Sequence, residues 1–128
     1  MTVFHPTIVS SKLIATVNFY EDYFDFVPVV EEDGYTLLCT PDLHGGRIAI
    51  FDTRHRRVKD VQPVRGLILN IPVEDVRGKY DLLYMEGLEF LKEPGTDIHG
   101  RKHFWVRDPN GVIVNVHEAV EVSALEPT

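Results

Sequence analysis

The chain has 128 residues, of which 44% are hydrophobic and 26% charged, and this fits a single compact domain with its own core. The formal net charge of −7 disfavours nucleic acid as a partner, because binding phosphates requires a concentrated basic face. No stretch reaches the roughly 18 apolar residues of a membrane span, so no membrane partner is expected. The single cysteine, Cys39, excludes an internal disulfide, and the N-terminus lacks a secretory signal pattern. Both features favour a cytoplasmic location.

The first half of the chain reads as a strand, a helix and further strands. Residues 7–9 predict a strand, and Ser11 is the expected N-cap of the helix that follows. That helix carries an apolar stripe at three- and four-residue steps, formed by Leu13, Val17, Tyr20 and Phe24. Residues 34–38 and 47–51 predict two strands. The polar and basic segment 53–64 is expected to be a solvated linker, with His55 on its surface and His44 in an earlier surface loop.

About sixty residues later the same order of signals returns. Residues 67–73 predict a strand, Asp75 an N-cap, and Val76, Tyr80 and Leu83 the apolar stripe of a helix. Gly87 stands where a left-handed C-cap residue is expected, and residues 88–91 alternate as a strand. Residues 103–106 and 112–116 predict a hairpin around the turn Asp108-Pro109-Asn110-Gly111.

The repeated order predicts an α+β fold of two tandem βαβββ modules, whose curved mixed sheets surround a cavity. We expect one domain over residues 1–128, with a first module at about 2–58, a second at about 64–118, and a loosely held tail at 119–128. A single module would expose one face of its sheet. Two modules can cover these faces by packing together, within one chain or across a homodimer.

Several short motifs resemble the vicinal oxygen chelate superfamily, which includes glyoxalases, bleomycin-resistance proteins and dioxygenases. They are Asn18-Phe19-Tyr20 with Phe24-Asp25-Phe26, in which Asp25 replaces a usual glycine, then Gly87-Leu88-Glu89-Phe90, and the hairpin at residues 100–111. The resemblance extends from about residue 4 to 118. It implies the fold above, but this scaffold hosts lyases, dioxygenases, thiol transferases and plain binding proteins.

The resemblance also implies four positions for metal ligands, in the first and last strand of each module. These positions fall on His5, on Phe51 (or Ala49 if the loop gap shifts), on Ile68 and on Asn115. Only His5 is an ordinary ligand for a transition metal, so it is a weak candidate and no cofactor is expected. A divalent metal at a different site made by His5, His117 and an acidic side chain is the less favoured alternative.

Without a metal, the cavity is expected to be a binding pocket lined by alternate strand residues. The predicted ligand-binding residues are His5, Thr7, Tyr35, Phe51, Ile68, Asn70, His103, Trp105, Asn115 and His117. Trp105 has two open roles, core packing and stacking on a planar ligand. Cys39 is expected to be a buried structural thiol rather than a reactive one.

The leading hypothesis is a homodimeric, metal-independent protein that binds an aromatic or hydrophobic small molecule and is not an enzyme. It resembles the bleomycin-resistance proteins, which sequester an aromatic, cationic antibiotic. One alternative is a glyoxalase-like lyase or dioxygenase that depends on a divalent metal. Another is an accessory module whose open sheet binds a protein.

Overall fold

The computed structural model describes residues 4–42, 45–62 and 66–119. The chain divides into two compact units, residues 1–65 and 66–128, and the boundary lies beside the predicted start of the second module. His44, the end of the predicted linker and residues 120–128 of the predicted tail lie outside the described residues. Among the described helices, none is long and apolar enough to span a membrane.

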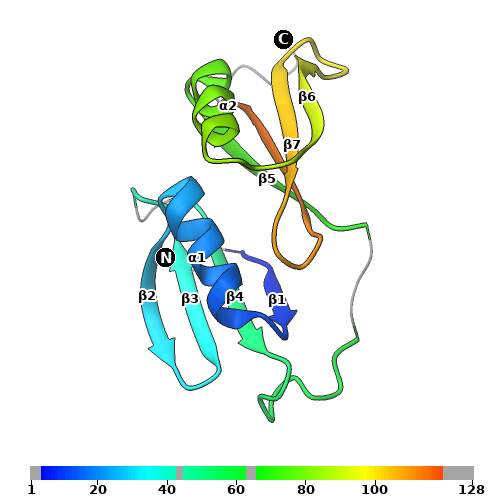
Figure 1. Ribbon diagram of the computed structural model, residues 1–128. Helices are drawn as coiled ribbons and strands as arrows, with labels where there is room; N and C mark the ends of the chain where they lie inside the picture. Colours follow the sequence, from blue (N-terminus) through cyan, green and yellow to red (C-terminus); the bar gives the residue numbers. More distant parts are fainter. Residues whose placement is uncertain (1–3, 43–44, 63–65, 120–128) are drawn as a thin grey trace, which may run out of the picture. The chain divides into compact units, whose positions relative to one another are not determined.

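Each unit consists of a strand, a helix and three more strands (Figure 1). Unit 1 contains β1 (Thr7–Ser10), α1 (Leu13–Phe24), β2 (Val27–Glu32), β3 (Tyr35–Cys39) and β4 (Arg47–Asp52). Unit 2 contains β5 (Ile68–Val73), α2 (Val76–Met85), β6 (Phe90–Thr96), β7 (Lys102–Arg107) and β8 (Ile113–Glu118). The predicted βαβββ repeat is therefore confirmed.

The two sheets have the same topology. The strand order is β1-β4-β3-β2 in unit 1 and β5-β8-β7-β6 in unit 2. In each sheet the first and last strands of the module pair in parallel, and the remaining pairs are antiparallel. Such a parallel pair requires a long crossover, and here the helix and two strands provide it. The predicted α+β class with mixed sheets is confirmed.

One face of each sheet packs against the helix of its own unit. In unit 1, α1 contacts β3 and β4, and the alternate residues Thr36, Leu38, Ile48 and Ile50 are buried. In unit 2, α2 contacts β6, β7 and β8, and Phe104, Val106, Val114 and Val116 are fully buried. Because side chains alternate along a strand, the intervening residues point the other way, onto what we call the helix-free face of each sheet.

The strand registers place equivalent residues of the two units in matching rows. On the helix-free face of unit 1, one row contains Thr7, Ala49, Leu37 and Val30, and the next contains Val9, Phe51, Tyr35 and Glu32. The corresponding rows of unit 2 contain Asn70, Asn115, Trp105 and Lys92, then Pro72, His117, His103 and Gly95. Ala49, rather than Phe51, therefore has the place in unit 1 that Asn115 has in unit 2.

The start of α1 differs from the prediction. Ser11 is not the N-cap: Lys12 has that position, and no side chain caps the helix. Ser10, at the end of β1, instead accepts a hydrogen bond from the backbone N–H of Lys12 at 2.8 Å. Thr16 is fully buried and donates to the carbonyl of Lys12 at 2.7 Å, whereas the predicted stripe residue Val17 is only half-buried. The apolar pattern does not predict this buried position, because threonine is polar and its hydroxyl is hydrogen-bonded within the helix.

Strands β2 and β6 were the hardest to predict. The sequence pattern does not mark residues 27–32 as a strand, and β6 runs from Phe90 to Thr96 rather than over the predicted residues 88–91. Pro94 and Gly95 read as strand breakers, but β6 is an edge strand whose register shifts between Phe90 and Gly95. Edge strands tolerate proline, and bulges accommodate the extra residues.

The turn of the second hairpin is confirmed. Asp108 is buried and accepts hydrogen bonds from the backbone N–H groups of Asn110 at 2.8 Å and Val112 at 3.0 Å. Gly111 adopts a positive φ of 82°. The side chain of Asp108 thus holds the turn between β7 and β8, as expected for an Asx turn.

Both helices end with a residue in the left-handed conformation. After α2, Gly87 has φ 86°, and the N–H groups of Gly87 and Leu88 donate to the carbonyls of Tyr84 and Leu83, which is a Schellman motif. After α1, the left-handed residue is Asp25, at φ 60°. Asp25 therefore occupies a position whose backbone geometry favours glycine.

We expect Asp25→Gly to stabilise the protein by about 0.5–1 kcal/mol. Glycine removes the cost of a Cβ at positive φ, and the change also removes a negative charge near the carboxyl end of α1. The greater freedom of glycine in the unfolded chain limits the gain. Urea unfolding measures the effect, with Gly87→Ala as the control of opposite sign. A lower free energy of unfolding for Asp25→Gly would contradict the prediction.

Candidate functional site

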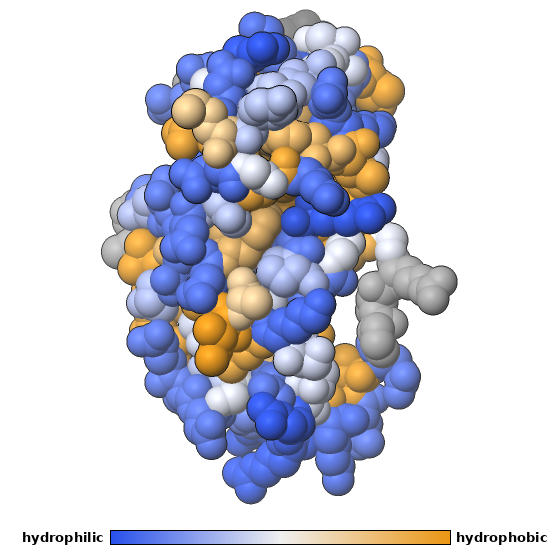
Figure 2. All heavy atoms as spheres, in the orientation of Figure 1, coloured by the Kyte–Doolittle hydropathy of each residue, from blue (hydrophilic) through white to orange (hydrophobic). Residues whose placement is uncertain are grey.

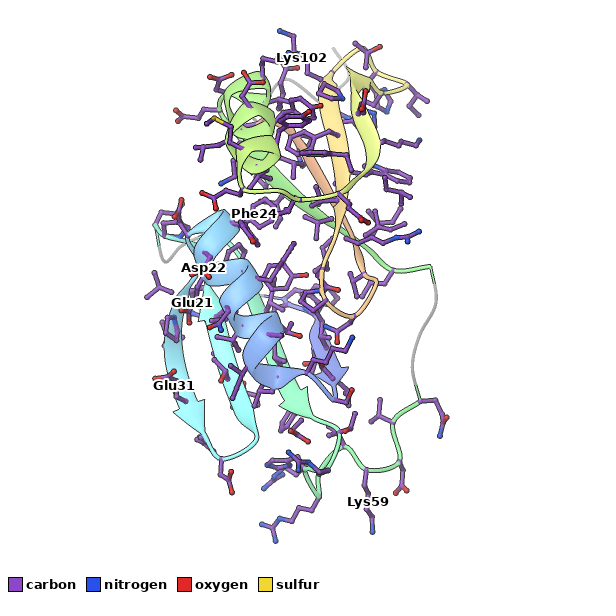
Figure 3. The ribbon with its side chains drawn as sticks, viewed as in Figure 1. Glu21, Asp22, Phe24, Glu31, Lys59 and Lys102 are labelled. Carbon is purple, nitrogen blue, oxygen red and sulfur yellow. The ribbon has the colours of Figure 1, made fainter. Side chains whose placement is uncertain are left out.

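A cavity of about 270 Å³ lies on the helix-free face of unit 1. Four predicted ligand-binding residues line it together: His5, Thr7, Tyr35 and Phe51. Four further residues, Glu32, Ala49, His55 and Arg57, complete the lining. Strands β1, β2, β3 and β4 each contribute, and the segment after β4 supplies His55 and Arg57. That segment continues to the exposed Lys59, which extends away from the strands (Figure 3).

Three rings form one wall of this cavity. Tyr35 and Phe51 are paired in the β3–β4 register, and their ring centroids are 4.5 Å apart at an angle of 52°. The ring of His55 meets Phe51 edge-on, at 4.8 Å and 66°. Tilted and edge-to-face rings at these distances attract each other, so the wall is formed without a ligand. We call these three residues the aromatic wall.

The position of His55 corrects the prediction that it lies on the surface of a solvated linker. Its backbone N–H donates to the carbonyl of Asp52 at 2.9 Å, which turns the chain back immediately after β4. Its ring lies over Gly34, where an added Cβ would come within 3.2 Å of the His55 Cδ2 atom. Gly34 also has φ 77°, so a side chain there would be both strained and in the way. No sequence periodicity marks His55, Arg57 or Glu32 as lining residues.

Asp52 anchors the same turn through Arg54. Its carboxylate accepts from the backbone N–H of Arg54 at 2.8 Å and from Nε and Nη2 of the guanidinium at 3.0 Å each. The side chain of Asp52 is 12% exposed and that of Arg54 is 89% exposed. Hydrogen bonds from the Arg54 side chain, and then from its backbone, lower the pKa of Asp52 from 3.8 to about 2. The charged carboxylate is therefore favoured by the fold.

This pKa gives the stability of the protein a defined pH dependence. Because the folded-state pKa of Asp52 is lowered, its contribution is complete above pH 3.8 and is lost as the pH falls through about 2. We expect Asp52→Asn to flatten the stability profile in that window. Arg54→Ala should return the pKa of Asp52 towards 3.8, as measured by NMR titration of the carboxyl carbon. Asp22→Asn, on an exposed position of α1, is the control and should preserve the wild-type profile.

The remaining predicted ligand-binding residues lie on the helix-free face of unit 2. They are Ile68 and Asn70 on β5, His103 and Trp105 on β7, and Asn115 and His117 on β8. Three of them form a chain of hydrogen bonds across the three strands. His103 Nδ1 lies 2.9 Å from Asn115 Oδ1, and Asn115 Nδ2 donates to Asn70 Oδ1 at 2.9 Å. At the places that Ala49 and Tyr35 have in unit 1, unit 2 thus carries the hydrogen-bonding side chains of Asn115 and His103.

The hydrogen-bond chain fixes the protonated nitrogen of a neutral His103 ring. Because Asn115 Oδ1 can only accept, Nδ1 of His103 must carry the proton and donate it. We expect Asn115→Ala to remove this preference, so that the ring changes from the Nδ1–H form to a mixture of both tautomers. The ring nitrogen shifts in ¹⁵N NMR measure this directly. His99, in the exposed β6–β7 loop, is an internal control, and unchanged His103 shifts would contradict the assignment.

Trp105 lies outside the helix-side core of its unit. Its neighbours on β7, Phe104 and Val106, are fully buried, whereas Trp105 is half-buried on the opposite face. The Nζ atom of Lys92 lies 4.1 Å from the centroid of its ring, a cation–π contact. Of the two roles open for Trp105, packing in this core is therefore excluded by its position on the sheet.

The places implied for metal ligands carry few donors. His5 lines the cavity of unit 1, but its counterpart in unit 2 is Ile68, and Ala49 is the counterpart of Asn115. Both ends of the Asn115 amide are engaged, with His103 and Asn70. Over the described ranges, no three His, Cys, Asp or Glu side chains gather to hold a metal. Cys39, at the end of β3, is buried as predicted.

The fold and these sites can be compared with known proteins. The family model of the Glyoxalase/Bleomycin resistance protein/Dioxygenase superfamily matches residues 2–116. The chain belongs to this superfamily. No curated protein matches it.

Several solved structures share the fold across nearly the whole chain. An integron cassette protein from V. cholerae has a TM-score of 0.72 and 19% identity, and the match covers 94% of this chain and 98% of that one. TioX from Micromonospora sp. ML1 has 0.72 and 15%, covering 93% and 100%. A lactoylglutathione lyase from Agrobacterium tumefaciens has 0.72 and 17%, covering 93% and 95%. At these identities the likeness establishes the fold alone.

Proposed function

We propose that the protein binds an aromatic or hydrophobic small molecule in the cavity of unit 1, without a metal. The observation that supports this most is the aromatic wall, because rings already fixed against each other offer an apolar surface at little entropic cost. Around it stand a few polar groups, among them Thr7 and Glu32. An apolar wall with a small number of polar groups is the usual composition of a ligand site.

The volume of the cavity limits the size of the ligand. At about 270 Å³ it lies just below the range of about 300–1,000 Å³ for small-molecule sites. A single ring with a small substituent, or one ring of a larger molecule, is the ligand that suits it. A large antibiotic of the kind sequestered by bleomycin-resistance proteins would have only part of its structure in this cavity.

Metal independence is supported by the chemistry of the donors. The superfamily's metal site requires several imidazole or carboxylate ligands around one cation. Here His5 is joined at the equivalent positions by Ala49, Ile68 and an asparagine whose amide is already hydrogen-bonded. This set does not fit a divalent transition metal. We therefore favour binding over a metal-dependent lyase or dioxygenase reaction.

The test is a titration with single-ring compounds, followed by the NMR signals of the Ala49 methyl group and the Tyr35 ring. We expect saturable shifts of both, unchanged by treatment with a chelator. Trp105 belongs to unit 2, so its fluorescence reports on the other sheet and serves as the comparison. If no aromatic compound shifts the Ala49 and Tyr35 signals, or if binding appears only with added zinc, nickel or manganese, the proposal fails.

We also propose that the protein acts as a homodimer. Each unit has a helix-free sheet face that its own helix does not cover, and a second copy of the chain is the partner that the superfamily resemblance implies. Hydrophobic side chains also reach the surface of unit 2 (Figure 2), including Leu82 and Met85, which are 57% and 87% exposed. Sedimentation should give twice the chain mass of 14.6 kDa. A mass of one chain at micromolar concentration would refute it.

A further inference from the structure

The tautomer of a neutral His55 ring follows from its hydrogen bond. The backbone N–H of Arg57 donates to His55 Nδ1 at 3.2 Å. A nitrogen that accepts a hydrogen bond carries no proton, so the proton of the neutral ring is on Nε2. Within the described part of the chain, Nε2 makes no hydrogen bond. His55 lines the cavity, and the ring nitrogen that it leaves for a ligand is a donor rather than an acceptor.

The ring that carries this donor is held in place on three sides. Phe51 contacts it edge-on at 4.8 Å, Gly34 lies beneath its Cδ2 atom, and the Arg57 backbone holds Nδ1. A donor fixed by such contacts loses little conformational freedom when a ligand binds. Because His55 belongs to the aromatic wall, a ligand ring on that wall would lie within the same lining as this donor.

The charges of the lining do not by themselves select a ligand. Glu32 stands at the β2 end of the row that contains Tyr35 and Phe51, and Arg57 contributes a positive charge. The net charge of −7 would attract cations from a distance, but salt screens such fields over about 8 Å. Hydrogen-bond direction acts at contact, where a donor on His55 would favour a ligand that carries an acceptor.

We propose that the cavity of unit 1 takes aromatic molecules that carry an oxygen acceptor on the ring, with a carboxylate as the best acceptor, and that His55 determines this specificity. This proposal rests on the proposed binding function. A charge-assisted hydrogen bond to a carboxylate is stronger than one to a neutral carbonyl, which orders the ligands within the class. A ligand that presents only donors meets the Nε2–H of His55 with no partner to accept it.

Three planar probes of nearly the same size test the proposal. Benzoate presents two acceptors, benzamide one acceptor and one donor group, and benzamidine only donors. We expect benzoate to bind at least about tenfold more tightly than benzamidine, with benzamide between them. Calorimetry gives the affinities, and the Ala49 methyl shift shows that each probe occupies this cavity.

Two substitutions separate the nitrogens of His55. In His55→Asn the side-chain amide can still accept from the Arg57 N–H but does not reach as far as Nε2, so the preference for benzoate should fall about tenfold or disappear. In His55→Gln the amide nitrogen takes the place of Nε2, so most of the preference should return. This rescue distinguishes a specific donor from a general loss of packing, because both variants remove the ring.

The outcomes distinguish this proposal from the function on which it rests. If none of the three probes shifts the Ala49 signal, the binding function itself fails. If all three bind equally, or benzamidine binds best, binding stands and the selectivity for acceptors is overturned, with Glu32 as the dominant group in the second case. If His55→Asn keeps the full preference for benzoate, His55 is not the determinant.

Discussion

Replacing Phe51 with alanine is expected to weaken the binding of an aromatic probe by at least about thirtyfold. Phe51 is the middle ring of the aromatic wall, with Tyr35 at 4.5 Å on one side and His55 at 4.8 Å on the other. Its loss removes the surface for the ligand and the edge contact that holds His55. Aromatic residues at the centre of a binding site typically cost about 2 kcal/mol or more when truncated. Calorimetry with benzoate measures the effect.

Two matched substitutions show whether the ring itself is responsible. Phe51→Leu keeps apolar bulk without a ring and should give an intermediate loss. Val27 also lies on the helix-free face, at the start of β2, but outside the cavity lining. Val27→Ala should therefore leave the affinity unchanged. Affinity in Phe51→Ala within a factor of about three of the wild type would show that the ligand does not lie on the aromatic wall.

Phe104→Ala is expected to destabilise unit 2 by about 3–5 kcal/mol. Phe104 is completely buried between the sheet and α2, and its ring lies 5.7 Å from that of Tyr80 and 5.6 Å from that of Phe90. The loss is a large part of the roughly 5–15 kcal/mol that stabilises a typical domain. Urea unfolding followed by the fluorescence of Trp105, the next residue on β7, reports on this unit.

The control for this prediction is the same change at a different degree of burial. Phe4 is fully exposed, so Phe4→Ala should alter the free energy of unfolding by no more than about 0.5 kcal/mol. A loss below about 1 kcal/mol in Phe104→Ala would mean that the aromatic cluster of unit 2 contributes little. It would also contradict the burial of the helix-side face of β7 in the core of unit 2.

The repeat of the fold was predictable because periodic signals encode it. Apolar stripes, the Gly87 cap and the turn at residues 108–111 are local features, and each sets its element without help from the rest of the chain. The bounds of β2 and β6 were not predictable in this way. An edge strand with Pro94, Gly95 and shifted registers lacks a clean period of two, and its pairing with β7 decides its extent.

Most of the site that could be predicted lies on regular strands. Alternation brought Thr7, Tyr35 and Phe51 to one face, and the structure places all three around the same cavity. His55 and Arg57 are different, because a turn held by Asp52 and Arg54 brings them there. A sequence shows the acidic and basic residues of that turn, but not the direction in which the turn points its side chains.

Because the two units repeat the same topology, each position on one sheet has an equivalent position on the other. Tyr35 and His103 occupy equivalent positions, as do Phe51 and His117, and Ala49 and Asn115. The same sheet topology thus carries mainly apolar side chains at these positions in unit 1 and polar side chains in unit 2. Side chains can therefore be exchanged between equivalent positions of the two units while the strand pairing of the backbone stays the same.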